Sequence, residues 1–468
     1  MSINRKNIRT FYTIFVFVAL GAFDNIVIGL FPPLFSMIAK DLHVPISSLG
    51  MISAVNILIT SLASIYWGYL AGKGNRKRYI IIGTLIWSIS IFLTSICRSY
   101  LQLFIFQSIT GIGLGCIASI GYSILTDSIP NKYRGMLLSL WGMTQGFGGI
   151  AGALMASLIA PATSWRKPFE IVSIIGFCLI ILYLFVKEPR IGESEPELKG
   201  LLDKGQKYNY CIQMKDLSLI ASKPSNIWLL LQGFFMNITT GTLIWLPTMY
   251  ISKIEHQGYN SHIAIVVAGY LFALLQTGGL TSSYFGYLGD VLQRKTYKGR
   301  ALLTASFVFL AAPLYTAMFL IPMTRLKLPD NDSPIVLLVS LLKEIVFNPW
   351  LTVMFALAFL ATAAQSANTP NWLALITDVN LPEHRATVFS TANLVSGLGR
   401  TIGNVGFGFI LAMVTANANE PNNYVITLII FQFFFIPSAF CYIKMSRFNS
   451  SDIKKVKLTL RHRNNKGK

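Results

Sequence analysis

Long apolar segments recur along the whole of this chain. Each holds about 20 or more mostly apolar residues, which at a rise of about 1.5 Å per residue crosses a hydrocarbon core roughly 30 Å thick. Because a backbone in lipid must satisfy its own hydrogen bonds, each segment is expected to be a helix. The chain is therefore predicted to be an all-α integral membrane protein with 12 transmembrane helices. They are expected at 11–38, 48–71, 79–97, 100–128, 133–160, 168–187, 226–251, 262–289, 300–322, 349–379, 385–415 and 422–445.

The amount and distribution of charge also indicate a membrane protein. Only 12% of the residues are charged and 53% are apolar, whereas about a quarter of a soluble domain is charged. A net charge of +20 would suggest nucleic-acid binding in a soluble chain. Here the loops on the side of the termini hold 30 of the 39 Lys and Arg residues, and the opposite loops hold 8. By the positive-inside rule, this multi-pass protein is expected to have both termini in the cytoplasm.

The predicted helices fall into two groups of six. Residues 1–187 form the N-terminal half, 188–225 a polar cytoplasmic linker, 226–445 the C-terminal half and 446–468 a basic cytoplasmic tail. The tail is expected to be solvated and attracted to anionic lipid headgroups. The connection 323–348 faces the opposite side, and its apolar string "SPIVLLVSLLKE" predicts a short interfacial helix.

Short strings repeat between the two halves. The string "GYLAGKGNRK" at Gly68 matches "GYLGDVLQRK" at Gly286, and "ILTDSIPNKYRG" matches "LITDVNLPEHRA". A basic cluster like the first string could be a nuclear-import signal, a nucleic-acid patch or a topology signal. Its place between two spans favours the topology signal. The repeats predict two pseudo-symmetric six-helix halves, an architecture found in secondary transporters.

These strings carry a family resemblance that covers nearly the whole chain. "GYLAGKGNRKR" resembles the loop signature G-x-L-a-D-r-x-g-r-k-r of the major facilitator superfamily, and "GYLGDVLQRK" is similar to its second-half counterpart. Within the superfamily, "GAFDN", "GTLIWLP" and "YKGRALL" are similar to the spinster-like branch, whose members export lysolipids or related amphiphiles. The chain departs from that branch at Asn25, where Arg is usual, and at Leu114, where an acid is usual.

The resemblance implies a gate at the cytoplasmic face. It contains the motif glycines Gly68 and Gly286, and its Arg residues pair with acids one helix further on. Carried over to this chain, these pairs are Arg76 with Asp127 and Arg294 with Asp378. The motif acid caps a helix of the opposite half, where the helix dipole favours negative charge. Asp290 can do this and Gly72 cannot, so we expect an asymmetric gate that a Gly72→Asp substitution would shift toward outward-facing.

Two charged residues are expected at membrane depth, where charge is costly unless it is paired or faces water. Counted along their helices, Asp24 and Arg400 both lie about 20 Å from the cytoplasmic face, one in each half. We predict that Asp24 takes up and releases a proton, and that Arg400 is its partner or binds an anionic group of the substrate. The alternative is a permanent structural ion pair, or an Asp24 that is hydrogen-bonded to its neighbours.

Uncharged polar residues in the spans are further candidates. They are Asn25, Asn56, Gln145, Asn237, Gln276, Gln365, Asn368 and Asn393. The resemblance places the first, fourth, seventh and tenth helices around the cavity, which favours Asn25, Asn237, Gln365 and Asn368 together with Trp245. Hydrogen bonding between helices is an equally good explanation for each. The glycines at 142, 146, 148, 152, 399 and 403 are expected to let helices pack closely where the two halves slide.

The combined prediction is a secondary active transporter. It would move a small organic or amphiphilic solute, anionic or lysolipid-like, by alternating access with proton coupling. The alternative is a transport-inactive receptor or sensor on the same fold. No enzyme, metal site or cofactor is predicted, because the chain has no nucleotide-binding or metal-ligand motif. The expected partners are membrane lipid, a small-molecule substrate and protons, with no nucleic acid, and the protein is expected to be a monomer.

Overall fold

The computed structural model describes residues 5–71, 75–128, 134–160, 162–186, 188–189, 218, 220–330 and 333–466, apart from some side chains inside helices, mainly in 5–10 and 134–146. All regular elements within these ranges are helical. The predicted linker 188–225 falls largely outside them, and so does Gly72.

In the first half, each predicted span is either a single helix or a series of consecutive shorter helices. A π-helical turn, η2, lies within the fourth span, and such turns are frequent at functional sites. The elements are α1 (Arg5–Leu30), η1 (Pro32–Leu34), α2 (Phe35–Leu42), α3 (Ile46–Ala71), α4 (Arg76–Ser95), α5 (Tyr100–Cys116), η2 (Ile117–Gly121), α6 (Tyr122–Ser128), α7 (Arg134–Ile159) and α8 (Arg166–Leu184).

The second half repeats this order with more interruptions. Its elements are α11 (Pro224–Thr242), η5 (Leu243–Trp245), α12 (Leu246–Glu255), α13 (Ser261–Leu275), η6 (Gln276–Thr281), α14 (Ser282–Lys295), α15 (Gly299–Leu320), α16 (Pro334–Phe347), α17 (Pro349–Ser366), α18 (Asn368–Val379), α19 (Pro382–Thr415), α20 (Asn422–Gln432), α21 (Phe435–Met445) and α22 (Asn449–Lys466).

The span count agrees with the prediction. Among the described residues, eleven helical segments are long and apolar enough to cross a membrane. The predicted fifth span is α7, a helix of 26 residues whose described apolar part is Phe147–Ile159. The fold is thus consistent with twelve spans.

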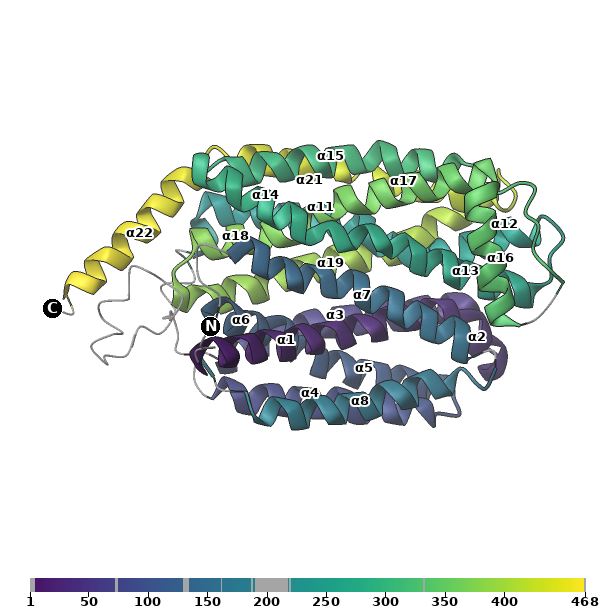
Figure 1. Cartoon of the computed structure of the whole chain (residues 1–468), viewed down its shortest axis with the longest axis horizontal. Helices are drawn as coiled ribbons and strands as arrows, with labels where there is room; N and C mark the ends of the chain where they lie inside the picture. The colour runs from purple at the N-terminus through teal and green to yellow at the C-terminus, as the bar shows by residue number, and fades with distance from the viewer. Residues whose placement is uncertain are drawn as a thin grey trace.

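Figure 1 shows the spanning helices aligned along one long axis, with both chain termini at the same end. We call this end the terminal face and the other end the far face. The first-half helices, in purple and blue, and the second-half helices, in green and yellow, lie side by side. The predicted interfacial helix is α16, which runs across the bundle axis at the far face.

Glycines let the helices inside each half come into backbone contact. A Cβ on Gly152 of α7 would lie 2.3 Å from the Ile26 carbonyl oxygen of α1, and a Cβ on Gly403 of α19 would lie 2.0 Å from that of Ile238 in α11. Because α1 and α7 belong to one half and α11 and α19 to the other, these glycines pack within the halves. The predicted place at a sliding interface between the halves is wrong for them.

The basic tail is more ordered than the sequence suggests. It forms α22, whose buried Val456 and Leu460 pack against Leu381 at the start of α19. Near its end, Arg463 Nη1 lies 2.6 Å from Glu383 Oε1. Its outer side exposes Leu458 and basic residues. The tail therefore docks on the terminal face of the second half by one apolar side.

Candidate functional site

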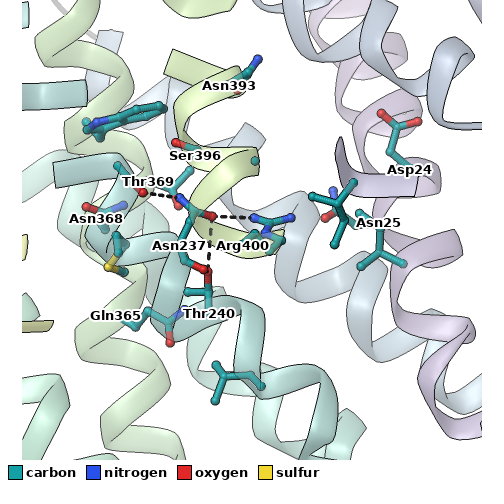
Figure 2. A pocket seen from close by; sticks show the side chains of 18 of the residues that line it. Asp24, Asn25, Asn237, Thr240, Gln365, Asn368, Thr369, Asn393, Ser396 and Arg400 are labelled. Atoms are coloured by element: carbon teal, nitrogen blue, oxygen red, sulfur yellow. Dashed lines mark hydrogen bonds between the residues drawn. The ribbon is translucent and has the colours of Figure 1, made fainter. Parts of the chain in front are cut away.

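A cavity of about 330 Å³ lies between the two halves. Six of the predicted site residues line it, and three more of the polar residues singled out from the sequence join them: Asp24, Asn25, Asn237, Gln365, Asn368 and Arg400, with Asn56, Gln276 and Asn393. The side chain of Gln145 is outside the described set. Figure 2 shows side chains from both halves around the cavity, among them Asp24, Asn25, Asn237 and Arg400.

Arg400 is positioned by its own half. Its helix, α19, packs against α11 so closely that a Cβ on Gly241 would lie 2.3 Å from the Arg400 carbonyl oxygen. Arg400 Nη2 donates to Asn237 Oδ1 at 3.0 Å, and Thr240 Oγ1 lies 3.3 Å from the same oxygen. The guanidinium extends from α19 toward α1 (Figure 2). Its remaining N–H groups can therefore bind an anion in the cavity.

Asp24 lies on α1, across the cavity from Arg400. Its Oδ1 atom is buried and has no hydrogen-bond partner among the described residues. Within the same part of the chain, no ion pair joins Asp24 to Arg400, although both line the cavity. The predicted similar depths of Asp24 and Arg400 are in keeping with a shared cavity. The structure does not contain the alternative, a permanent ion pair between them.

The cavity amides are oriented by bonds to their own helices. Asn25 Nδ2 donates to the Gly21 carbonyl oxygen at 2.7 Å, and Asn237 Nδ2 donates to that of Gly233 at 2.8 Å. Only the NH₂ end of an asparagine side chain can donate to a carbonyl oxygen. These bonds therefore turn the NH₂ group toward the helix and leave the Oδ1 atom pointing away from it.

Trp245 is not part of the cavity lining. Its ring is buried and stacks on Phe407 with centroids 5.2 Å apart, and Nε1 donates to Asn404 Oδ1 at 2.9 Å. Asn404 Nδ2 in turn donates to the Gly50 carbonyl oxygen of the first half at 3.2 Å. The prediction of Trp245 as a cavity residue is therefore wrong, and the residue belongs to a contact between the halves at the far face.

A second contact joins the halves toward the terminal face. Tyr122, just after the π-helical turn, donates from its hydroxyl to the Leu373 carbonyl oxygen at 2.6 Å and lies 2.6 Å from Thr377 Oγ1. Its ring stacks on Phe389 with centroids 3.8 Å apart. Because Leu373 and Phe389 also line the cavity, this contact closes the cavity toward the terminal face.

The predicted ion pair of the first-half loop motif is present. Arg76 Nη1 lies 2.8 Å from Asp127 Oδ2, and both side chains are buried. Arg76 Nε also lies 2.7 Å from Glu188 Oε1. The motif glycine Gly68 is buried in α3, as Gly286 is in α14. These contacts join α4 to α6 and to the chain beyond α8.

The second-half pair differs from the prediction. Within the described residues, the ion pair with Asp378 is made by Arg300, whose Nη1 lies 2.6 Å from Asp378 Oδ2 and whose Nη2 also pairs with Asp290. The reason is helix length: α14 continues to Lys295, so Arg294 lies in its last turn, whereas Arg300 begins α15 as Arg76 begins α4. The capping of a first-half helix by Asp290 stays a prediction.

Several cavity residues were not singled out in the sequence. Tyr315 lines the cavity and donates its hydroxyl to Gln365 Oε1. The small hydroxyl residues are Thr60, Ser61, Ser64, Thr240, Ser282, Thr362, Ser366, Thr369 and Ser396. Hydroxyl groups in apolar helices usually bond to a preceding carbonyl, as Thr60 Oγ1 does to Asn56 at 2.8 Å, so their sequence positions carry little signal.

The chain is similar to several known transporters. It is 23% identical over 265 residues to the cis,cis-muconate transport protein of Acinetobacter baylyi, covering 55% of this chain and 61% of that protein. It is 23% identical over 329 residues to the niacin transporter NiaP of the same organism, covering 62% and 73%. It is 25% identical over 162 residues to Protein spinster of Drosophila melanogaster, covering 34% and 26%. The match to the first of these spans less than two thirds of the relative's length.

The fold is shared with a solved structure. A bacterial homologue of the human lysosomal transporter spinster, crystallised inward-facing and unoccupied, superposes with a TM-score of 0.67 at 18% identity, over 95% of this chain and 98% of that one. The sequence profile described as Major Facilitator Superfamily matches residues 14–342. With its duplicated six-helix halves and the cavity between them, this chain belongs to the Major Facilitator Superfamily of membrane transporters.

Proposed function

We propose that this protein is a secondary active transporter that moves a small organic or amphiphilic solute with an anionic group by alternating access. The observation that carries the proposal is the Arg400 guanidinium in a cavity between the halves. It donates a hydrogen bond to the amide of Asn237, and among the described residues it forms no ion pair with a carboxylate. A volume of about 330 Å³ suits a small solute. A lysolipid-like solute would place only its headgroup there.

Alternating access requires that the halves separate on one side of the cavity at a time. Contacts between the halves lie on both sides, at Tyr122 toward the terminal face and at Asn404 toward the far face. Each is one part of a wider contact between helices of the two halves, such as α3 with α19 and α7 with α14, and each includes a hydrogen bond that contributes about 1 kcal/mol. This arrangement supports a rocking motion about the cavity.

Proton coupling is proposed for Asp24. A carboxylate at membrane depth is costly without a proton or a countercharge, and Asp24 Oδ1 is buried without a partner among the described residues. The ionisable side chains that line the cavity with it, in the part of the chain the structure describes, are Arg400 and Tyr315. A change in the separation of the halves would change the charge environment of Asp24 and so its proton occupancy.

The topology follows from the basic loops. Both termini lie at one face (Figure 1), and the loops of that face hold 30 Lys and Arg residues against 8 on the other. By the positive-inside rule, we propose that the terminal face is cytoplasmic. The similar proteins named for muconate and niacin transport are in keeping with a small organic solute.

Transport should be tested with purified protein in proteoliposomes. Uptake of a panel of radiolabelled organic acids would be measured with and without a pH gradient, for the wild type and for Asp24→Asn. We expect gradient-dependent uptake in the wild type and its loss in the variant, with counterflow retained. An Asp24→Asn protein with full pH-dependent uptake would rule out the proton role.

The same assay separates the transporter from a receptor on this fold. A transport-inactive receptor would bind an organic acid in a thermal-shift measurement and show no counterflow. A transporter would exchange labelled for unlabelled solute across the membrane.

A further inference from the structure

The first-half wall of the cavity presents hydrogen-bond acceptors. Asp24 contributes a carboxylate whose Oδ1 has no partner among the described residues. Asn25 uses its nitrogen to bond to Gly21, and Asn56 Nδ2 donates to the Gln107 carbonyl oxygen at 2.6 Å. Both amide oxygens are left to the cavity. A group that donates N–H bonds and carries positive charge therefore fits this wall.

The second-half wall presents the opposite chemistry. Asn368 Oδ1 accepts from Gln232 Nε2 and from the Tyr442 hydroxyl, both at 2.8 Å. Gln365 Oε1 accepts from Tyr315. These bonds occupy the oxygens of Asn368 and Gln365 and leave their NH₂ groups as donors, and both residues line the cavity with Arg400. Donors of this kind bind a carboxylate or another acid group.

This polarity follows from the hydrogen bonds that hold each amide in place. Each amide is held by groups behind it, such as Gln232 and Tyr442 behind Asn368, so reversing a side chain would break one or two bonds. The two walls are thus pre-set, one for a cation and one for an anion. The hydroxyl groups of Thr60 and Thr362 do not add to the contrast, because both donate to carbonyls of their own helices.

We propose that the substrate is a small amino-acid-like zwitterion, whose acid group is bound by Arg400 and whose protonated amine is bound by Asp24. This inference rests on the proposed transport function and narrows its substrate class. A substrate bound to both walls bridges the two halves across the cavity. The amine must carry N–H bonds, because the open oxygens of Asn25 and Asn56 accept hydrogen bonds that a quaternary ammonium cannot donate.

Binding should be measured by calorimetry on the full-length protein in lipid nanodiscs. The probes are β-alanine, γ-aminobutyrate and ε-aminocaproate, each compared with the carboxylic acid of the same length that lacks the amine. We expect at least one amino acid to bind about tenfold or more tightly than its matched acid, the scale of a close charge pair. Asp24→Asn should remove that preference and leave binding of the simple acid within about threefold, while Arg400→Gln should weaken both.

Two surface variants control for general damage. Arg166 Nη2 lies 2.9 Å from Asp41 Oδ2, and this ion pair is partly exposed and lies away from the cavity. Asp41→Asn and Arg166→Gln should therefore leave the preference for the amine unchanged. A fourth probe, γ-trimethylammoniobutyrate, should bind more weakly than γ-aminobutyrate.

The outcomes distinguish a failure of the zwitterion inference from a failure of the proposed transport function. If simple acids bind through Arg400 and are transported, but no amino acid binds better, the zwitterion inference is overturned and the transporter stands. If an amino acid binds as expected and shows no counterflow, the transport function fails and the binding mode stands. Equal losses of acid and amino-acid binding in Asp24→Asn, or no binding of any probe to the wild type, would also overturn the inference.

Discussion

Two arginines at the terminal face are almost fully buried and occupy equivalent places in the two halves. Arg76 begins α4 and pairs with Asp127, and Arg300 begins α15 and pairs with Asp290 and Asp378. Removing one partner of a buried pair leaves an uncompensated charge, which costs more than the pair contributes. These positions should therefore be far more sensitive than ion pairs at the surface.

Arg76→Gln is expected to lower the free energy of unfolding by about 3–5 kcal/mol, because it breaks the buried ion pair between Arg76 and Asp127. The measurement is thermal unfolding of the purified protein in detergent. The matched control is Lys167→Gln, which removes an exposed pair with Glu170 three residues away. That change should cost no more than about 0.5 kcal/mol, and similar losses in the two variants would contradict the argument.

At the scale of elements, the close packing of α19 on α11 fixes where Arg400 lies. The backbones touch at Gly399 and Gly403, where a Cβ would lie 2.3 Å and 2.0 Å from carbonyl oxygens of α11. In lipid, small residues let helices approach in this way. Any side chain at these positions must push the helix pair apart and displace Arg400 with it.

Gly403→Ala is expected to destabilise the protein by about 1–3 kcal/mol through overpacking, and to weaken binding of organic acids through the shift of Arg400. The readouts are the midpoint of thermal unfolding and the affinity for acids. Gly408→Ala is the control on the same helix, because a Cβ there meets nothing within 4 Å. Alanine favours a helix over glycine by about 1 kcal/mol, so this variant should be at least as stable as the wild type. Loss of stability in Gly408→Ala as large as that in Gly403→Ala would refute the packing explanation.

At the scale of the whole molecule, the contacts on the two sides of the cavity oppose each other. Tyr122 holds the halves together toward the terminal face, and Asn404 does so toward the far face. Weakening one should favour separation on that side. Because each hydrogen bond contributes about 1 kcal/mol, its loss should shift the equilibrium of the halves about fivefold.

Tyr122→Phe and Asn404→Leu are expected to shift the molecule in opposite directions. Tyr122→Phe keeps the stacked ring against Phe389 and removes only the hydroxyl, so the halves should separate more at the terminal face. Asn404→Leu should have the same effect at the far face. Spin-label distances between α6 and α18 at one face, and between α3 and α12 at the other, measure both. Shifts in the same direction would be incompatible with two opposing contacts.

Much of the architecture could be predicted from the sequence. The spans and the depths of Asp24 and Arg400 follow from the one-dimensional rise of a helix through lipid, which needs no knowledge of neighbours, and the duplication follows from the repeated strings. The cost of charge at membrane depth singled out Asp24 and Arg400. The family resemblance was needed to favour Asn25, Asn237, Gln365 and Asn368 among the other polar residues.

Other features depend on how the helices face one another. Whether a polar residue faces the cavity or another helix depends on the rotation of its helix about the helix axis, and packing sets that rotation. The sequence therefore predicted Trp245 in the cavity lining, where it does not lie, and did not favour Asn56 and Gln276, which do lie there. The exchange of Arg294 for Arg300 depends on where α14 ends. The sequence by itself determined which groups lie at membrane depth. Only the tertiary structure decided how Asn56, Gln365 and Asn368 are tied back within the two walls, because their bonds come from residues far apart in the chain.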